Sequence, residues 1–221
     1  MNTPFFRIAP EGLPIICAVA VLGWVFAIFG FVFLSFLFLV AFGFTLFFFR
    51  DPSRTTPSEN GLVISPSDGR VIEVSSERED GFLHSDVTRV SVFLSIFDCH
   101  VNWFPVSGEV TASVYRKGRF SFGFDKNASK HNEQLATLVK PDGGAPEIVV
   151  AQVAGFIARR IISHAPQGAR LKRGDRFGII KFGSRIDLFL PPEYEVRVKK
   201  GDRVVGSETV IARFTAGAGA G

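Results

Sequence analysis

Three short segments of this chain carry side chains that could take part in one reaction. Asp68 stands in a Ser-Asp-Gly turn, His100 follows Cys99 after a β-branched run, and Ser184 follows Gly183 between two apolar runs. Judged singly, each has an ordinary structural explanation, since aspartate favours turns, histidines are often buried with their hydrogen bonds satisfied, and Gly-Ser is a common bend. The combination of a hydroxyl, an imidazole and a carboxylate is therefore more informative than any one of them.

Taken together, these segments resemble the short form of the phosphatidylserine decarboxylase family. The resemblance extends to the order of parts, with an apolar N-terminus first and the Gly-Ser pair about forty residues before the end. It covers nearly all of the chain after the apolar run. The motifs that carry it are Phe48-Phe49-Arg50-Asp51-Pro52, Ser65-Pro66-Ser67-Asp68-Gly69, His100-Val101-Asn102, Pro105-Val106-Ser107-Gly108, and the run 176–187 around Lys181-Phe182-Gly183-Ser184-Arg185.

The resemblance implies a proenzyme that splits between Gly183 and Ser184 without hydrolysis. The products are a large chain, 1–183, and a small chain, 184–221, which stay together as a heterodimer; a higher oligomer is left open. Gly183 has no Cβ, so it can adopt strained backbone angles that let the Ser184 hydroxyl approach its carbonyl carbon. Attack gives an ester, β-elimination gives dehydroalanine, and loss of ammonia leaves a pyruvoyl group in place of Ser184.

The implied activity is that of a carboxy-lyase that converts phosphatidylserine to phosphatidylethanolamine. The pyruvoyl cofactor derived from Ser184 forms a Schiff base with the substrate amine and takes up the electrons left by carbon dioxide. A weak alcohol nucleophile needs a base and the base an orienting partner, so we expect His100 to deprotonate Ser184 and Asp68 to fix the tautomer of His100. His100 is also the candidate proton donor in turnover.

The chain departs from the longer family members at two places. They carry a second histidine three residues after the first, where this chain has Trp103, and Leu-Gly-Ser-Thr at the cut, where it has Phe182-Gly183-Ser184-Arg185. The identity of the base therefore stays open, with His84, His131 and His164 as the alternatives to His100.

An uncharged apolar run precedes these segments. Residues 13–49 contain no Asp, Glu, Lys or Arg over 37 positions. One straight helix of that length would measure about 55 Å, against a hydrocarbon core of about 30 Å. We therefore expect a helical hairpin that folds near Gly30, with Arg7 at one end and Arg50 and Arg54 at the other, which favours a cell-membrane anchor with both ends cytoplasmic. A cleaved signal peptide is the alternative, but the run is too long for one.

The chain after residue 54 is predicted to be mainly β. Its polar, proline-containing start ends the helices, and the rest holds short β-branched runs separated by Gly, Pro, Asp and Asn. We expect an N-terminal anchor and linker, 1–54, followed by a compact antiparallel β-sandwich or barrel, 55–221. The expected strands are 70–74, 87–97, 109–115, 147–153, 177–182 and 185–190.

Charge and composition favour binding at a lipid surface over metal or nucleic-acid binding. The net charge of +4 and the pI of about 9.3 suit an anionic lipid surface. Arg159, Arg160 and Arg185 are candidates for the lipid phosphate, or else members of a solvated face. Four histidines and two cysteines show no metal-ligand spacing, and no nucleic-acid-binding motif accompanies the charge.

Three alternatives remain. Another serine-headed lipid would present the same amine and carboxylate. A membrane-tethered binding module would use 196–214, which resembles biotin- or lipoate-carrying modules but lacks their lysine between methionines. A serine hydrolase would want a Gly-x-Ser-x-Gly elbow, which these segments do not supply.

Overall fold

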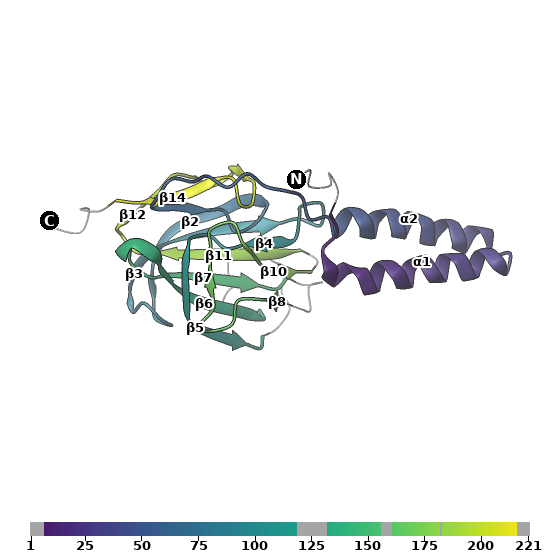
Figure 1. The fold of residues 1–221 in the computed structure, drawn as a ribbon, viewed down its shortest axis with the longest axis horizontal. Helices are drawn as coiled ribbons and strands as arrows, with labels where there is room; N and C mark the ends of the chain where they lie inside the picture. Colours follow the sequence, from purple (N-terminus) through teal and green to yellow (C-terminus); the bar gives the residue numbers. More distant parts are fainter. Residues whose placement is uncertain (1–6, 119–131, 156–160, 182, 216–221) are drawn as a thin grey trace. The chain divides into compact units, whose positions relative to one another are not determined.

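The computed structural model describes residues 7–118, 132–155, 161–181 and 183–215. These form two compact units, residues 1–53 and residues 54–221. The first unit is helical and the second is built from β-strands (Figure 1). The prediction of a mainly β, antiparallel fold with apolar helix at its N-terminus is confirmed.

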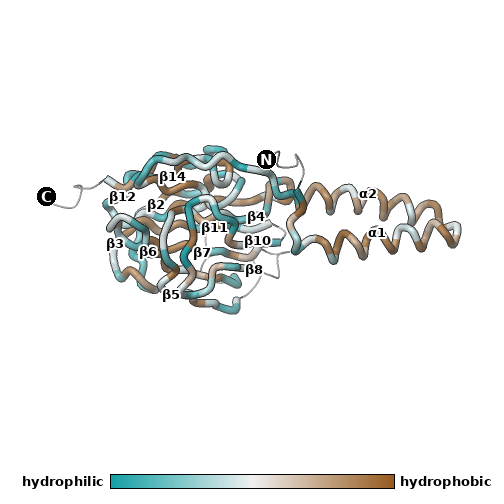
Figure 2. The backbone as a smooth tube through the Cα atoms, viewed as in Figure 1, coloured by the Kyte–Doolittle hydropathy of each residue, from teal (hydrophilic) through white to brown (hydrophobic). Residues whose placement is uncertain are grey.

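Two apolar helices make up the first unit. The short η1 (Pro10–Gly12) leads into α1 (Leu13–Ile28), and α2 (Val32–Phe48) runs back beside it. The chain reverses at Gly30, whose φ of +76° favours glycine. Phe26 of α1 stacks on Phe38 of α2 with ring centroids 5.3 Å apart. Hydrophobic residues surround both helices instead of forming one stripe, as Figure 2 shows, and such helices suit an apolar environment on every side.

The described residues of the second unit form three antiparallel sheets. The eight-stranded sheet has the order β13-β2-β3-β11-β7-β6-β5-β9, and the smaller sheets have the orders β4-β10-β8 and β1-β14-β12. The strands are β1 (Leu62–Ile64), β2 (Gly69–Glu79), β3 (Ser85–Leu94), β4 (Val101–Trp103), β5 (Gly108–Arg116), β6 (Gln134–Pro141), β7 (Ile148–Val153), β8 (Ile161–Ser163), β9 (Arg170–Leu171), β10 (Arg176–Ile180), β11 (Ser184–Leu190), β12 (Tyr194–Val196), β13 (Arg203–Val204) and β14 (Val210–Phe214), with the 3-10 turn η2 (Asp142–Gly144) between β6 and β7.

One core holds the three sheets together. Its members alternate along the strands, so that Val90, Val92 and Leu94 of β3 share a face with Ile186 and Leu188 of β11. Further members come from the two small sheets, among them Phe177 of β10, and Ile211 and Ala212 of β14. The segment 196–214 therefore belongs to the shared core and does not fold as a separate carrier module.

Strand β11 occupies the middle of the large sheet. It pairs with β3 on one side and β7 on the other, and all seven of its residues are buried. The predicted run 87–97 ends earlier than expected because Asp98 turns the chain by accepting hydrogen bonds from the backbone N–H and hydroxyl of Ser95. This turn carries the chain from β3 into the segment that holds His100.

Candidate functional site

Ser184 is the first residue of the central strand β11. Its Cα is registered with Leu94 of β3, and the next residue, Arg185, is registered with Val153 of β7. The residue is completely buried, and its hydroxyl has no hydrogen-bond partner among the described residues. Leaving a buried polar group unpaired costs about 1–3 kcal/mol. The strand thus holds a desolvated hydroxyl at a fixed position.

Gly183 stands immediately before this strand in the left-handed region, with φ +58°. A Cβ at this position would meet no atom within 4 Å. Glycine is therefore suited to position 183 for its backbone angle and not for lack of space. The peptide between Gly183 and Ser184 lies where a turn gives way to the sheet.

The imidazole of His100 lies beside this peptide. The side chain is fully buried between the end of β3 and the start of β4. Its Nδ1 is 2.9 Å from the carbonyl oxygen of Asp98, and its Nε2 accepts a hydrogen bond from the backbone N–H of Gly183 at 3.4 Å. Because a carbonyl oxygen only accepts, Nδ1 carries the proton and Nε2 is the basic nitrogen. The structure thus brings the basic nitrogen of His100 to the Gly183–Ser184 pair.

Asp68 is held by other groups. Its carboxylate accepts two hydrogen bonds from Arg54, at 2.7 and 2.8 Å, and one from the backbone N–H of Gly206 at 2.8 Å. The Arg54 guanidinium also lies 5.1 Å from the centre of the Trp103 ring. The Asp68 turn packs on β4, since the Trp103 N–H donates to the Pro66 carbonyl at 2.9 Å. We expected Nδ1 of His100 to donate to the Asp68 carboxylate, but it donates to the backbone carbonyl of Asp98.

Two buried amides that the sequence analysis did not single out connect His100 to strand β7. Asn102 donates to the His100 carbonyl at 3.3 Å, and Gln152 donates to the Asn102 side-chain oxygen at 2.8 Å. Gln152 is registered with Ile186, two residues after Ser184, so it shares a sheet face with Ser184. The His-Val-Asn motif was a signal for Asn102, whereas nothing in the sequence marked Gln152.

The alternative histidines lie elsewhere. His84 is exposed in the turn between β2 and β3, with φ +50°, and His164 is exposed after β8. His131 lies outside the described residues, as do Arg159 and Arg160. Among the described residues, no group of three or more His, Cys, Asp and Glu side chains is arranged to hold a metal ion.

Arg185 points away from Ser184 because neighbouring residues on a strand face opposite sides of the sheet. Its Nε is 2.6 Å from the Asp187 carboxylate, with both side chains fully buried, and its terminal nitrogen donates to the Ser91 hydroxyl at 2.9 Å. Arg185 is therefore neither on a solvated face nor open to a lipid phosphate. Nearby, Arg89 pairs with Glu73 at 2.9 Å and with Glu77 at 3.2 Å.

Burial raises the pKa of Glu77 above its ordinary value of 4.5, although the Arg89 guanidinium acts in the opposite direction. This sheet face therefore holds several charges in a poorly solvated setting. The reacting groups are on the other face.

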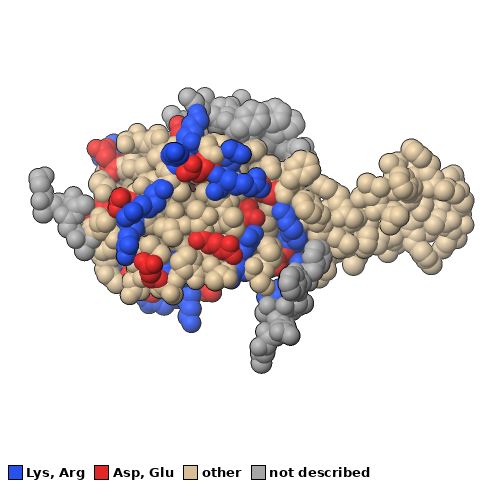
Figure 3. All heavy atoms as spheres, turned by 90° about the horizontal axis from the view of Figure 1, so that it is seen from above, with Lys and Arg blue, Asp and Glu red and all other residues tan. Residues whose placement is uncertain are grey.

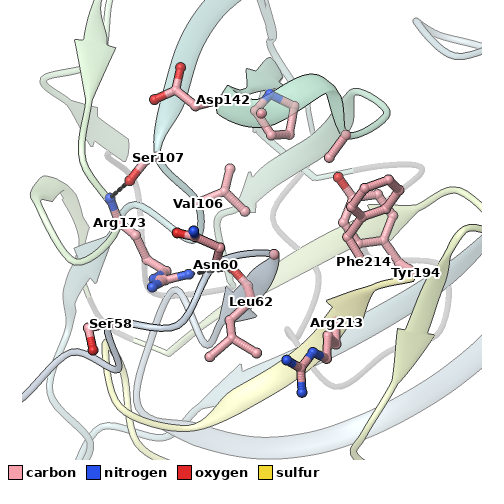
Figure 4. Close-up of a pocket in the computed structure, with 14 residues that line it drawn as sticks. Ser58, Asn60, Leu62, Val106, Ser107, Asp142, Arg173, Tyr194, Arg213 and Phe214 are labelled. Atoms are coloured by element: carbon pink, nitrogen blue, oxygen red, sulfur yellow. Dashed lines mark hydrogen bonds between the residues drawn. The ribbon is translucent and has the colours of Figure 1, made fainter. Parts of the chain in front are cut away.

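A cavity of about 580 Å³ lies near Tyr194, which follows the far end of β11 (Figure 4). Its cations are Arg173 and Arg213, and Tyr194 and Phe214 supply aromatic walls. Arg173 donates to the carbonyls of Leu62 and Pro57, at 3.1 and 2.6 Å, so its guanidinium ties loops together. None of Ser184, His100 and Asp68 lines this cavity.

Comparisons with known proteins identify the family of this chain. Residues 41–212 match the family model described as phosphatidylserine decarboxylase. The chain is 44% identical over 215 residues to the phosphatidylserine decarboxylase proenzyme of Geobacter metallireducens, covering 95% of this chain and 96% of the relative. It is 41% identical over 225 residues to the proenzyme of the same name from Nitrosomonas europaea, covering 97% of this chain and all of the relative.

The proenzyme of Symbiobacterium thermophilum is 47% identical over 171 residues, which is 77% of this chain and 79% of the relative. These matches span both the site and most of the β unit. The chain belongs to the phosphatidylserine decarboxylase family.

Proposed function

We propose that this chain is a carboxy-lyase that decarboxylates phosphatidylserine to phosphatidylethanolamine after cutting itself between Gly183 and Ser184. Family membership supports the reaction, and the name proenzyme given to the relatives supports processing. The observation that carries the proposal is the buried Ser184 hydroxyl, without a partner among the described residues, next to a glycine whose backbone N–H donates to Nε2 of His100.

Self-cleavage would proceed in two steps, and formation of the pyruvoyl group would be a third. The Ser184 oxygen adds to the Gly183 carbonyl carbon and gives its proton to Nε2 of His100; the C–N bond then breaks as that proton passes to the Ser184 nitrogen, leaving an ester. Transfer of the Ser184 Cα proton to a base would then form the Cα=Cβ double bond and break the Cβ–O bond, which frees the Gly183 carboxylate and leaves dehydroalanine. Water then replaces the nitrogen as ammonia, and the small chain begins with a pyruvoyl group.

The residues present fit such a group. It would occupy the buried start of β11, which remains paired with β3 and β7 when the peptide before it is cut. A pyruvoyl group supplies a carbonyl that takes the substrate amine and draws off the electron pair left by carbon dioxide. His100, next to the Gly183–Ser184 pair, would hold the proton that replaces carbon dioxide on the product.

Asp68 would not bond His100 directly and would act on it through the residues between them. Its carboxylate fixes Arg54 against Trp103 and holds the Gly206 backbone, and the same turn is bonded to β4 through Pro66. We therefore assign Asp68 to holding β4, and with it His100, in register. A carboxylate is suited to this because it accepts from Arg54 and Gly206 at once.

The first unit would anchor the enzyme in the cell membrane as a helical hairpin. The stretch Pro10–Ile28 is long and apolar enough to cross a bilayer, and Val32–Phe48 is a shorter apolar helix. With both ends cytoplasmic, the three sheets would form a cytoplasmic sandwich that meets lipid substrate at the surface. The two cleavage products, 1–183 and 184–221, would remain together as a heterodimer because β11 supplies the centre of the large sheet.

The test is lipid decarboxylation by the purified full chain in detergent or vesicles. We expect phosphatidylethanolamine and carbon dioxide in equal amounts, and inactivation by phenylhydrazine, which captures pyruvoyl carbonyls. Ser184→Ala should give no product, whereas Ser75→Ala, which also removes a buried hydroxyl without a partner among the described residues, should stay active. Release of serine or fatty acid in place of carbon dioxide would contradict decarboxylation and indicate a hydrolase.

A further inference from the structure

The backbone at Gly155 lies against the peptide that is to be cut. Gly155 comes two residues after Val153, the residue of β7 that is registered with Arg185. A Cβ on Gly155 would overlap the carbonyl oxygen of Gly183 and lie 2.9 Å from its carbonyl carbon. Cβ atoms do not approach a backbone carbonyl this closely. The structure therefore leaves no room for a side chain at position 155.

The two glycines meet different needs. Gly183 has open space around its Cβ position and a left-handed backbone, so its requirement is conformational. Gly155 is not among the described residues with positive φ, so its requirement is space. The atom that takes this space is the oxygen of the carbonyl that Ser184 attacks.

We propose that Gly155 is a positioning residue for self-cleavage: its bare backbone sets the direction of the Gly183 carbonyl and leaves room for the oxygen as the carbon becomes tetrahedral. This inference rests on the proposed self-cleavage. During attack the Oγ–C bond forms and the C=O electron pair moves to that oxygen, which must shift while Ser184 and His100 stay in place. A methyl group at 155 would turn the carbonyl out of line, and a misplacement of about 1 Å can cost about 100-fold in rate.

The effect should be confined to processing. While the chain is intact, Gly183 is bonded to Ser184 at the start of β11, so its carbonyl cannot retreat from Gly155. Once the bond is cut, Gly183 is the C-terminus of the large chain and its carboxylate is free to move. Chains that have been cut should therefore turn over substrate normally even with alanine at position 155.

The experiment follows newly synthesised full chains by intact mass after a pulse of translation. Gly155→Ala is compared with Gly108→Ala, whose Cβ would overlap the Lys140 carbonyl oxygen and lie 2.9 Å from the Pro141 Cα. The two variants create the same kind of backbone clash, but only Gly155→Ala places it on the carbonyl to be attacked. We expect similar losses of unfolding temperature, with cleavage slowed about 100-fold in Gly155→Ala and by less than about threefold in Gly108→Ala.

Two further readouts separate positioning from general damage. Hydroxylamine cleaves esters, so it should release no 184–221 fragment from Gly155→Ala if attack by Ser184 is the blocked step. The fraction of Gly155→Ala that is slowly cut should show a kcat per pyruvoyl group within about threefold of the wild type.

Cleavage of Gly155→Ala at the wild-type rate, equal stalling of both variants, release of the fragment by hydroxylamine, or a low kcat per pyruvoyl group would each overturn the inference. An uncut wild-type chain would instead overturn the proposed function itself.

Discussion

The two units of this chain place charge and apolar surface in opposite ways. In the helical unit, Val32 and Phe33 are 78% and 73% exposed. In the β unit, Arg185 and Asp187 are fully buried. Figure 3 shows the same contrast on one face of the molecule, with Lys, Arg, Asp and Glu scattered over the β unit and none along the paired helices. The helices therefore carry the apolar surface that the proposed membrane anchor needs, and the β unit has charged groups outside and polar groups inside.

This difference locates the chemistry. Apolar side chains all around a helix pair gain little from one another in lipid and supply no reactive group. In the β unit, the packing of a large core offsets the free-energy cost of burying a hydroxyl, a histidine and an ion pair. The hydroxyl and the ion pair lie on opposite faces of β11. Cleavage should therefore depend on the β unit, and attachment to membranes on the helices.

The largest effect should come from His100. His100→Ala removes the base beside Gly183, so self-cleavage should slow by about 100- to 10,000-fold. The matched control is His164→Ala, which removes an exposed histidine of the same unit and should cleave at the wild-type rate. The measurement is the fraction of uncut chain over time. Full cleavage in His100→Ala would show that another residue is the base.

The buried ion pair gives the next largest effect. Arg185→Leu leaves Asp187 charged and buried, which should cost about 3–5 kcal/mol of unfolding free energy. The double variant Arg185→Leu with Asp187→Leu should lose less, because no charge is then left unpaired. Arg197→Leu breaks an exposed pair with Glu195 and should cost less than about 1 kcal/mol. Equal costs for the single and double variants would show that packing, not charge, is what Arg185 provides.

A charge placed in the helices tests whether their apolar surface is needed for membrane attachment. Leu39 is an exposed residue of α2, and Leu39→Lys should weaken membrane insertion by about 2.5–3.5 kcal/mol. The share of chain that sediments with vesicles should fall while self-cleavage continues at the wild-type rate. Leu39→Ile is the control. A cleavage defect in Leu39→Lys would break the division between the units.

The smallest effect should come from Glu77. Its folded pKa is raised, so the stability contributed by its protonated form is present below 4.5 and is lost as the pH rises through the folded value. Glu77→Gln lacks this loss. The stability of the variant minus that of the wild type should therefore be larger at about pH 8 than at about pH 4. The change should be less than about 0.5 kcal/mol because the group is partly exposed. Urea unfolding at the two pH values measures it. A wild type that gains on the variant as pH rises would contradict the sign.

Local patterns predicted much of this architecture. The uncharged run indicated paired helices with a turn at Gly30, and the β-branched runs indicated five strands of the large sheet and β10. Strand β6 was missed although it lies between β5 and β7, because Thr137 and Val139 are the only β-branched residues in its run of eight. Strand β4 was missed because three residues give no period.

The site was predictable where one motif holds the chemistry and not where distant strands meet. Gly183, Ser184 and His100 were named from sequence, and the structure brings them together. The hydrogen bond between His100 and the Asp98 carbonyl depends on turn geometry, and the contact of Gln152 with Asn102 depends on how two different sheets pack on each other. Gly155 gave no signal because its neighbour is the backbone carbonyl of Gly183, a residue distant in the sequence.

The most direct test is the intact mass of the purified wild-type chain beside that of Ser184→Ala. We predict two chains for the wild type, 1–183 with an ordinary C-terminus and 184–221 beginning with pyruvoyl, and one uncut chain of 221 residues for the variant. A single uncut chain from an active wild-type preparation, or a Ser184→Ala chain that is still cut between Gly183 and residue 184, would contradict the account.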